Sequence, residues 1–545
     1  MALTLAVVVF GIYSRSLGFQ FILDDHRFTS DPRIQDGGHI WDYFSNYVWA
    51  QFAGGPPSFY RPVFLLWVRM NFMLAALSSW GWHFLSIAKH VVAAALVGML
   101  GWRLLADWKA AFAAAILFAL HPAQTESVSW VTVPDPLMTA ALLGALLLYF
   151  RSLSPAIPAR PERKARKKSA TRISENPLLW RMAAAGMYFA ALLTKETAII
   201  FPAVIFALAV FREPARPSNQ TNKRGGADFG ARLAQGVGHI MPFVCATALY
   251  LLLRFHALGG KLGSPTQHLP WRTVVLSWPA ILWFYVKAML WPVRSYSFAD
   301  PTVLATFSVR GVLFPLLAFA GFAAVVLTAS FWAWGKARPE SGADRREAVR
   351  DALITGTLLL FLPLILTLNL NSLNPGDFLH GRYTYLPLAG LVLLIAAWWC
   401  RFEEIRAIWP AAAGVLAITF AVLTIFQERQ WKDDATVFST AHQLAPHNAP
   451  VARNLADTSV ERALALQGEG RCDEAIPMFN RVIGDYPDNW FALAGLSVCY
   501  VKLNDFPKAE ESLRRAAEIS RNPRVIQQWQ ELRAQMGLSN SATTD

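Results

Sequence analysis

Long apolar runs separated by short polar segments make up the first 427 residues of the chain. A membrane-spanning helix needs about 20 predominantly apolar residues, so the shorter runs must recruit flanking polar residues to cross. The candidate spans are residues 2–14, 82–101, 110–126, 135–150, 179–194, 197–211, 233–253, 311–334, 352–370, 384–400 and 407–426. This pattern predicts an all-α, polytopic membrane bundle with about eleven crossings.

Two further apolar segments are expected to lie in the membrane interface rather than to cross it. Residues 271–293 are rich in Trp and carry Arg272 and an internal Pro279, which suits a helix at the membrane surface. Residues 62–77 are interrupted by Arg69 in the middle of the run. We therefore expect two interfacial helices beside the spans.

The net charge of the chain becomes informative when the positions of the charged residues are considered. Hydrophobic residues make up 54% and charged residues 16%, yet the net charge is +13. Residues 151–175, 212–232 and 336–350 carry +6, +3 and +2, eleven of the thirteen charges. Basic loops between apolar runs mark the cytoplasmic face of a membrane protein. A nucleic-acid site would be interleaved with aromatic residues, which these stretches almost lack, so the lipid bilayer is the expected partner and nucleic acid is not. A specific acidic partner is the alternative.

With the N-terminus in the cytoplasm, eleven crossings put all three basic stretches inside. Counting 271–293 as a twelfth span would put the last basic stretch or the tail on the wrong side. The segments expected outside are 15–81, 121–134, 254–310, 371–383 and everything after about 427.

The chain divides by composition into a membrane domain, 1–427, and a charged, Ala-rich tail, 428–545. In the tail, Ala475 and Ala509 occupy equivalent places in similar segments and lie 34 residues apart. That period is typical of tetratricopeptide repeats, with Ala at the tight contact between paired helices. We therefore predict a C-terminal tetratricopeptide-repeat solenoid; a generic helical tail is the alternative.

Two adjacent carboxylates, Asp24 and Asp25, directly follow an apolar stretch in the first outer segment. Desolvation and mutual repulsion near a membrane surface could raise the pKa of one and leave the other ionised. Such a pair suits general-base catalysis. A solvated turn or helix cap explains the same residues without a function.

Other ionisable residues gather at the outer ends of the spans, opposite the basic stretches. Ionisable groups at membrane depth are costly and are functional candidates by default, although each could equally be a structural pair or a snorkelling side chain. Lys195, Arg254 and Arg382 could together hold a phosphate. The remaining members of the set are His83, Lys89, His90, His121, Glu126, Glu196 and Tyr383.

The cysteines and the familiar nucleotide motifs add little. Cys245 and Cys400 fall in expected spans, while Cys472 and Cys499 fall in the tail, where an oxidising compartment would permit a disulfide. The sequence contains no Cys/His metal spacing, P-loop or Gly-rich dinucleotide fingerprint. No cofactor is firmly implied, no metal ligands are assigned, and a divalent metal stays possible without support.

These motifs, taken in order, resemble those of the membrane-embedded tetratricopeptide-repeat O-mannosyltransferases and their bacterial relatives, members of the GT-C class of polyprenyl-phosphate-sugar-dependent glycosyltransferases. The resemblance covers nearly the whole chain. The matching pieces are Leu23-Asp24-Asp25, Phe59-Tyr60-Arg61-Pro62-Val63, His83 and His90, Leu117-Phe118-Ala119-Leu120-His121-Pro122 with Thr125-Glu126, Lys195-Glu196, Arg382-Tyr383-Thr384-Tyr385-Leu386-Pro387, and the terminal repeats.

The resemblance implies a GT-C-like bundle and a catalytic base in the first outer segment, either Asp24 or Asp25, with Asp24 favoured. It implies a polyprenyl-phosphate-linked sugar donor whose phosphate is bound by Lys195, Arg254 and Arg382. Contacts to the acceptor or the sugar would come from Arg61, His83, His90, His121, Glu126, Asp135, Glu196 and Tyr383. The acceptor polypeptide could be presented by the repeats.

The chain departs from the family pattern at three places. Gln124 stands where a second His is usual, Val133-Pro134 replaces Gly-Arg before Asp135, and Gly381 precedes Arg382 where an acid is common. These departures leave the donor contacts open and are compatible with a different sugar or acceptor.

The leading hypothesis is an inverting membrane glycosyltransferase that moves a sugar, mannose by resemblance, to a hydroxyl of an extracytoplasmic protein. The rival is a non-catalytic, membrane-anchored tetratricopeptide scaffold for envelope assembly. A transporter is less favoured because the ionisable residues gather at the outer ends rather than at the midplane between repeated halves. We expect a bacterial inner membrane with periplasmic repeats; an endoplasmic-reticulum membrane with the same topology is the alternative.

Overall fold

The computed structural model describes residues 1–52, 58–153, 176–211, 229–263, 266–294, 303–335, 343–373, 379–402 and 406–537. The chain forms two compact units, Met1–Asp433 and Asp434–Asp545. None of the described residues forms a β-strand, so the all-α fold expected from the sequence is confirmed. Most of the basic stretches 151–175, 212–232 and 336–350 lies outside the described residues.

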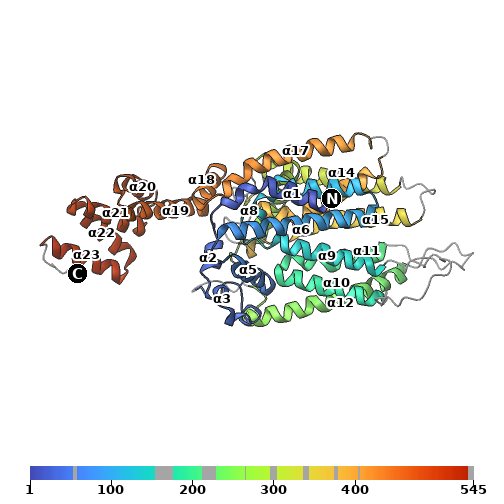
Figure 1. The fold of residues 1–545 in the computed structure, drawn as a ribbon, viewed down its shortest axis with the longest axis horizontal. Helices are drawn as coiled ribbons and strands as arrows, with labels where there is room; N and C mark the ends of the chain where they lie inside the picture. The colour runs from blue at the N-terminus through green and yellow to red at the C-terminus, as the bar shows by residue number, and fades with distance from the viewer. Residues whose placement is uncertain are drawn as a thin grey trace, which may run out of the picture. The chain divides into compact units, whose positions relative to one another are not determined.

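Each of the eleven apolar runs is a helix, and these helices run roughly along one common direction (Figure 1). They are α1 (Ala2–Ile12), α6 (Ser79–Leu105), α7 (Trp108–Leu120), α9 (Asp135–Leu153), α10 (Pro177–Thr194), α11 (Phe201–Phe211), α12 (Phe229–Ala257), α14 (Phe314–Gly335), α15 (Ala343–Leu366), α16 (Tyr385–Trp399) and α17 (Trp409–Gln427). Short helical turns extend several of them: η4 (Glu196–Ile200), η5 (Val309–Leu313), η7 (Gly381–Thr384) and η9 (Glu428–Trp431).

Length and composition make the chain an integral membrane protein. Eight helices of the described chain are long and apolar enough to cross a membrane. The expected spans α1, α7 and α11 are shorter: the 13 residues of α7 rise about 20 Å, against a hydrocarbon core about 30 Å thick. Eleven crossings therefore stay a prediction.

Helix α13 (Trp271–Leu290) is one of these eight by length, but its contacts lay it across one end of the bundle. The indole of Trp278 donates to the carbonyl oxygen of Leu368, just beyond α15 (3.0 Å). Near the other end of α13, the carbonyl oxygen of Met289 lies 2.9 Å from Nε2 of His121, just beyond α7. The segments that follow α15 and α7 meet at one end of the bundle, through an ion pair described below. Both halves of α13 therefore contact that end, as the interfacial interpretation requires.

Close approach of backbones joins α15 to α16 in the membrane unit. A Cβ on Gly390 would come within 2.5 Å of the backbone nitrogen of Leu360, and one on Gly356 within 2.9 Å of the carbonyl oxygen of Gly390. No side chain fits at either position. This contact sets the position of η7, which begins the α16 segment and carries Arg382.

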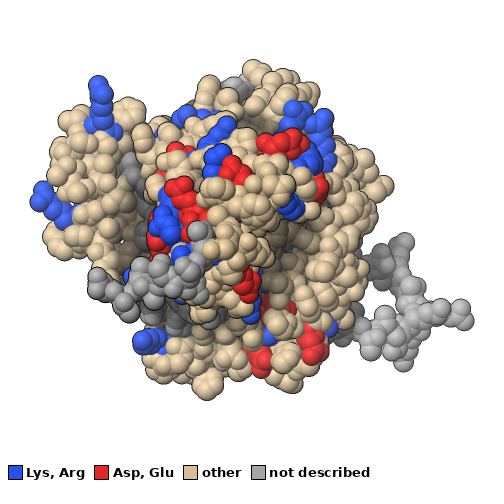
Figure 2. Space-filling model, turned by 90° about the vertical axis from the view of Figure 1, so that its left-hand side faces the viewer, with Lys and Arg blue, Asp and Glu red and all other residues tan. Residues whose placement is uncertain are grey.

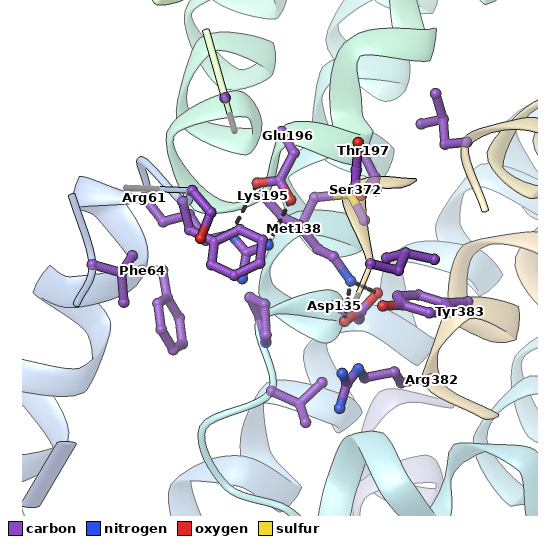
Figure 3. A pocket seen from close by; sticks show the side chains of 18 of the residues that line it. Arg61, Phe64, Asp135, Met138, Lys195, Glu196, Thr197, Ser372, Arg382 and Tyr383 are labelled. Atoms are coloured by element: carbon purple, nitrogen blue, oxygen red, sulfur yellow. Dashed lines mark hydrogen bonds and ion pairs between the residues drawn. The ribbon is translucent and has the colours of Figure 1, made fainter. Parts of the chain in front are cut away.

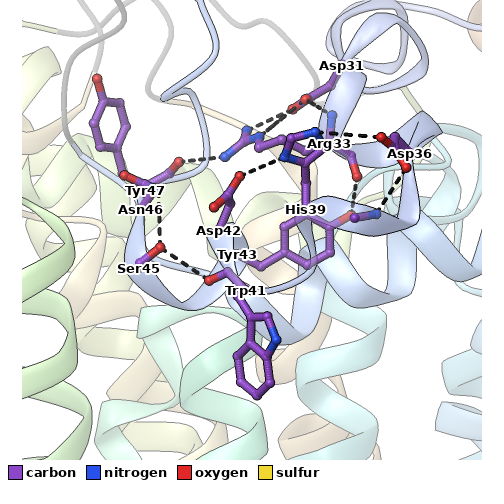
Figure 4. Close-up of polar contacts among 11 residues, drawn as sticks. Asp31, Arg33, Asp36, His39, Trp41, Asp42, Tyr43, Ser45, Asn46 and Tyr47 are labelled. Carbon is purple, nitrogen blue, oxygen red and sulfur yellow. Dashed lines mark hydrogen bonds and ion pairs between the residues drawn. The ribbon is translucent and has the colours of Figure 1, made fainter.

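The first outer segment folds into short helices held by a buried ion pair (Figure 4). Arg33 pairs with Asp31 at 2.7 Å, with both side chains 1% exposed, and also donates to the carbonyl oxygen of Val48. The hydroxyl of Tyr43 donates to the carbonyl oxygen of Arg33, and burial raises the pKa of Tyr43 to about 12, so it remains a donor. The elements are η1 (Ser14–Gly18), α2 (Asp25–Ser30), α3 (Pro32–Gln35), η2 (Gly37–His39) and α4 (Asp42–Ser45), followed by α5 (Pro62–Ala75).

The second unit is a row of antiparallel helices. Ala475 and Ala509, the predicted contact residues of successive repeats, are both fully buried. Gly495 leaves room for the ring of Phe479, which a Cβ would approach to 2.5 Å. The helices are α18 (Asp434–Leu444), α19 (Ala449–Gly468), α20 (Cys472–Asp485), α21 (Trp490–Lys502), α22 (Phe506–Ser520) and α23 (Pro523–Gln535).

The two tail cysteines, whose pairing the sequence left open, form a disulfide. Cys472 at the start of α20 is bonded to Cys499 in α21, with 5.3 Å between the Cα atoms. Figure 2 shows basic and acidic side chains interspersed on the face that it draws.

Candidate active site

A cavity of about 810 Å³ lies at the end of the bundle occupied by the first outer segment and α5. Six parts of the chain that are distant in sequence line it. They contribute Asp24, Arg27 and Trp49 from the first outer segment, Arg61 and Phe64 at the start of α5, Thr132, Asp135 and Met138 around the start of α9, Lys195, Glu196 and Thr197 between α10 and α11, Tyr250 and Arg254 from α12, and Leu366, Asn371, Arg382 and Tyr383 between α15 and α16.

At the centre of the cavity wall is a buried ion pair between Lys195 and Asp135 (Figure 3). Nζ of Lys195 lies 2.7 Å from each carboxylate oxygen of Asp135, and each side chain is 5% exposed. Lys195 is an extended residue at the break after α10, whereas Asp135 begins α9 directly after Pro134. The ammonium lies 4.9 Å from the ring centre of Tyr383. Two of its three N–H donors are used by Asp135.

Arg382 is held by a carboxylate behind the wall. Its backbone N–H donates to Oε2 of Glu126 (3.1 Å) and its Nη1 to Oε1 (3.2 Å). Nδ1 of His380 lies 3.0 Å from the same Oε1. The Glu126 side chain is 1% exposed and that of Arg382 is 17% exposed, with its guanidinium 4.7 Å from the ring centre of Trp130. Glu126 therefore anchors Arg382 with part of its guanidinium toward the cavity.

A second ion pair joins α5 to the α10–α11 junction. Arg61 donates from Nε and Nη2 to the two carboxylate oxygens of Glu196, at 2.9 and 2.6 Å, in a bidentate arrangement. Arg254 holds the opposite wall by backbone contacts: its Nη2 donates to the carbonyl oxygen of Ser58 and its Nε to that of Leu262, both at 2.8 Å. Both arginines therefore tie outer segments to the bundle.

The adjacent carboxylates of the first outer segment differ in environment. Asp24 is partly exposed and lines the cavity. Asp25 is fully buried and does not line it. Burial raises the pKa of Asp25 to about 7, although hydrogen bonds from Thr132 and Ile22 lower it in part. The two side chains therefore cannot have the same role.

The three histidines of the predicted set are buried outside the cavity lining. Nδ1 of His90 lies 2.7 Å from the hydroxyl of Tyr385, and its Nε2 lies 2.9 Å from the carbonyl oxygen of Ala119, which joins α6, α16 and α7. His121 caps the turn after α7 and contacts α13. His83 packs edge-on against Phe19, with 6.0 Å between ring centres. In these positions they join helices.

Arg27, Trp49 and Asn371 are among the lining residues that were not singled out in the sequence. Asp24 is the N-cap residue of α2 and Arg27 lies three positions later in that helix, a spacing that places both on one face. The guanidinium of Arg27 lies 5.7 Å from the ring centre of Trp49. Asn371, in the segment after α15, also lines the cavity. No local pattern marks Trp49 or Asn371.

The cavity has an excess of positive charge. Five cationic side chains and three carboxylates line it; the cations are those of Arg27, Arg61, Lys195, Arg254 and Arg382, and the carboxylates those of Asp24, Asp135 and Glu196. Within the described part of the chain, no group of three or more His, Cys, Asp or Glu side chains is arranged to hold a metal ion. The arrangement suits an anionic ligand, and the partly exposed carboxylate of Asp24 in the same lining could act as a base.

Comparison with known proteins finds relatives that match nearly the whole chain. Over 95% of its length the chain is 23% identical to human protein O-mannosyl-transferase TMTC3, covering 55% of that protein. It is 25% identical to human TMTC1 over 89% of its length, covering 55% of that protein. It is 32% identical to Drosophila melanogaster Tmtc2 over 40% of its length, covering 22% of that protein. The chain thus spans about half the length of the first two relatives.

Residues 466–536 match the family model described as tetratricopeptide repeat, which confirms the repeat interpretation of the tail. The resemblance to the transmembrane and tetratricopeptide-repeat O-mannosyl-transferases is likewise confirmed. Among solved structures, ArnT from Cupriavidus metallidurans bound to undecaprenyl phosphate has a TM-score of 0.37 at 13% identity, covering 94% of this chain and 79% of ArnT. Archaeoglobus fulgidus AglB, an archaeal oligosaccharyltransferase in complex with an inhibitory peptide and a dolichol-phosphate, has a TM-score of 0.42 at 14% identity, covering 83% of this chain and 59% of AglB.

Proposed function

We propose that the chain is an integral-membrane glycosyltransferase that moves a sugar from a polyprenyl-phosphate donor to a hydroxyl of an extracytoplasmic protein. The observation that carries this proposal is a single cavity in which the partly exposed carboxylate of Asp24 shares the lining with Lys195 and Arg382. A base and a set of cations in one cavity are what transfer from a phosphate leaving group requires.

In the proposed reaction, the carboxylate of Asp24 accepts the proton of the acceptor hydroxyl. The hydroxyl oxygen then forms a bond to C1 of the sugar while the bond from C1 to the phosphate oxygen breaks. The electron pair of that bond leaves with the phosphate, which remains on the lipid. Attack from the side opposite the leaving group inverts C1. The negative charge gained by the departing phosphate is stabilised by preorganised cations.

Lys195 and Arg382 are proposed to hold the donor phosphate. Lys195 retains one N–H beyond the two directed to Asp135, and Arg382 is fixed by Glu126 through its backbone and one terminal nitrogen. Preorganisation by carboxylate partners keeps both cations in place before the donor binds, so little reorganisation is needed during transfer. Arg254 has fewer nitrogens to offer, because its contacts to backbone carbonyls use Nε and Nη2.

The cavity also has an apolar side that suits a lipid-linked donor. Leu251 of α12 and Pro363 and Leu366 of α15 line it beside the charged residues. A polyprenyl chain could leave along this apolar wall toward the bilayer while its phosphate stays with the cations. Burial of apolar surface would contribute to donor binding at about 25 cal/mol per Å².

The finer identity of the substrates is proposed from the relatives. They are named protein O-mannosyl-transferases, which supports mannose as the sugar and a protein as the acceptor. The tetratricopeptide unit is proposed to recruit that polypeptide, because stacked helical repeats offer extended binding surfaces. We place the repeats on the extracytoplasmic side, in the periplasm of a bacterial inner membrane, with the lumen of the endoplasmic reticulum as the eukaryotic equivalent.

The test is transfer of radiolabelled sugar from polyprenyl-phosphate donors to candidate peptides by the full chain in detergent. Asp24→Asn removes the base and should lower kcat by about 10²–10⁴-fold. The matched control is Asp36→Asn, an exposed carboxylate of the same outer segment that caps Gly38, which should leave kcat within about twofold. Absence of transfer by the wild type with every donor, or equal transfer by Asp24→Asn, would refute the proposal.

A further inference from the structure

The turn that carries Asp24 has an unusual backbone. Leu23 has a φ of 54°, the left-handed conformation that a branched side chain rarely adopts. Such a residue costs of order 1–3 kcal/mol and persists only where its surroundings enforce it. The residues on either side supply that enforcement: the N–H of Asp25 donates to the carbonyl oxygen of Ile22 (2.9 Å), and the N–H of Ile22 donates to Oδ2 of Asp25 (3.2 Å).

The other oxygen of Asp25 reaches a different part of the chain. Oδ1 accepts from the hydroxyl of Thr132 at 2.6 Å and from the backbone N–H of Thr132 at 3.2 Å. Thr132 is itself a lining residue and lies three positions before Asp135, the partner of Lys195. One buried carboxylate thus ties the turn that presents Asp24 to the segment that leads into the ion pair.

The same segment is held from α6. Nζ of Lys89, a side chain 4% exposed, donates to the carbonyl oxygens of Val131 (3.4 Å) and Val133 (3.0 Å). Thr132 therefore lies between two residues whose carbonyls bind a buried ammonium, while its own donors bind a buried carboxylate. The peptide group between Val131 and Thr132 is bound on both sides, its carbonyl oxygen by Lys89 and its N–H by Asp25, which fixes the position and the rotation of this backbone.

We propose that Asp25 is a positioning residue for the transferase, acting through Ile22 and Thr132, with Lys89 as its counterpart, to hold Asp24 in register with the Lys195–Asp135 pair. This inference rests on the proposed function. It assigns the two adjacent carboxylates different tasks: Asp24 receives the proton, and Asp25 sets where it is received.

The competing assignment makes Asp25 the base. A base must come within hydrogen-bond reach of the acceptor hydroxyl, whereas Asp25 is fully buried, lies outside the cavity lining and already accepts three hydrogen bonds. An acceptor could reach it only after the turn and the 131–133 segment had separated. The position of Asp25 therefore favours a task performed through its neighbours.

Direct replacement of Asp25 could prevent folding, so the test uses its partner. Thr132→Val removes the hydroxyl donor but keeps the shape and the backbone N–H, whereas Thr132→Ser keeps the donor. The matched control is Thr139→Val on α9: its hydroxyl is also buried but has no hydrogen-bond partner among the described residues. Each variant is assayed for kcat, donor KM and thermal unfolding in detergent.

We expect Thr132→Val to lower kcat by about ten- to a hundredfold with donor KM within about threefold, since small misplacements of reacting groups have effects of this size. Thr132→Ser should recover most of that loss, and Thr139→Val should match the wild type. Wild-type kcat for Thr132→Val in an active enzyme would overturn the inference alone. A loss that Thr132→Ser does not recover would also overturn it, whereas an inactive wild type would overturn the proposed function and the inference with it.

Discussion

Removal of one partner from the Lys195–Asp135 pair should separate its structural role from its proposed chemical role. Each side chain is 5% exposed. Lys195→Met would leave the Asp135 carboxylate buried without its cation. Asp135→Leu would leave the Lys195 ammonium buried without its carboxylate. Loss of one partner of a buried pair costs about 3–5 kcal/mol, most of it the penalty for the remaining charge.

That cost is large enough to measure. With about 2.1 cal/mol/K of unfolding entropy per residue, 1 kcal/mol shifts the Tm of a unit as large as Met1–Asp433 by about 1 °C. We therefore expect each single variant to melt about 3–5 °C lower. The double variant Lys195→Met/Asp135→Leu removes both charges together. Hydrophobic replacement of a whole buried pair is often neutral or stabilising, so its melting temperature should return to within about 1 °C of the wild type.

The assay is thermal unfolding in detergent followed by tryptophan fluorescence, beside sugar transfer by the same samples. Stability should return in the double variant while transfer stays lost, because the proposed phosphate ligand is still missing. The control is Arg406→Met, which breaks the pair between Arg406 and Asp107 (3.0 Å), where the arginine is 47% exposed. An exposed pair contributes about 0–1 kcal/mol, so this variant should melt with the wild type.

Two results would refute this reasoning. Single variants as stable as the wild type would mean that the pair is hydrated rather than buried. A double variant that transfers sugar at the wild-type rate would remove Lys195 from the donor site, whatever its effect on stability.

Three further outcomes follow from other features. Burial raises the pKa of Asp25 to about 7, and the charged groups that interact with it among the described residues include Asp24 and Lys89. Transfer should therefore fall about tenfold between its plateau above pH 8 and pH 6, as a pH–rate profile would show; a flat profile contradicts this. Gly390→Ala should lower Tm by about 1–3 °C, since overpacking typically costs about 1–3 kcal/mol, and an unchanged Tm would contradict the close approach. Reduction of the Cys472–Cys499 disulfide, with its separation of 27 residues, should destabilise the repeat unit by about 2–4 kcal/mol in denaturant titrations; equal stability would mean the bond adds nothing.

The pH dependence of stability from Asp25 has a definite sign. Its pKa is raised on folding, so the folded state binds more protons than the unfolded state between about pH 4 and pH 7. The contribution of Asp25 to the free energy of unfolding is therefore greatest in acid and falls as pH rises through that window. Activity should change in the opposite direction, because the ionised form accepts all three hydrogen bonds. If stability and transfer activity both fell as the pH was lowered, a group other than Asp25 would be responsible.

The hydrophobic pattern was sufficient to locate the membrane helices, because burial in lipid demands continuous apolar runs. The eleven apolar runs all became helices, and the 34-residue spacing of Ala475 and Ala509 identified the repeats. Element boundaries were less predictable: α12 extends to Phe229, four residues before the expected span. The pattern alone could not distinguish a helix such as α13 that crosses the bilayer from one that lies across its surface, because length and composition suit both.

The candidate site was predictable as a group but not as a set of pairs. Charges at the outer ends of spans had to find partners, which placed Lys195, Asp135 and Arg382 in one region. Which carboxylate binds which cation depends on contacts between segments 60 to 256 residues apart. The same cause explains why His90, which was expected at the site, is outside the cavity lining, whereas Arg27, which was not expected, lines it. The hydroxyl of Tyr385 lies within hydrogen-bond distance of His90, and the short helix α2 carries Arg27 to the cavity.

Lys195 and Glu196 are consecutive, yet each is bonded to a different neighbour: Lys195 to α9 through Asp135, and Glu196 to the start of α5 through Arg61. One peptide unit therefore fastens three elements together. A change of backbone conformation at that peptide would displace both side chains, so a substitution that distorts this junction should weaken the contacts to α9 and to α5 together.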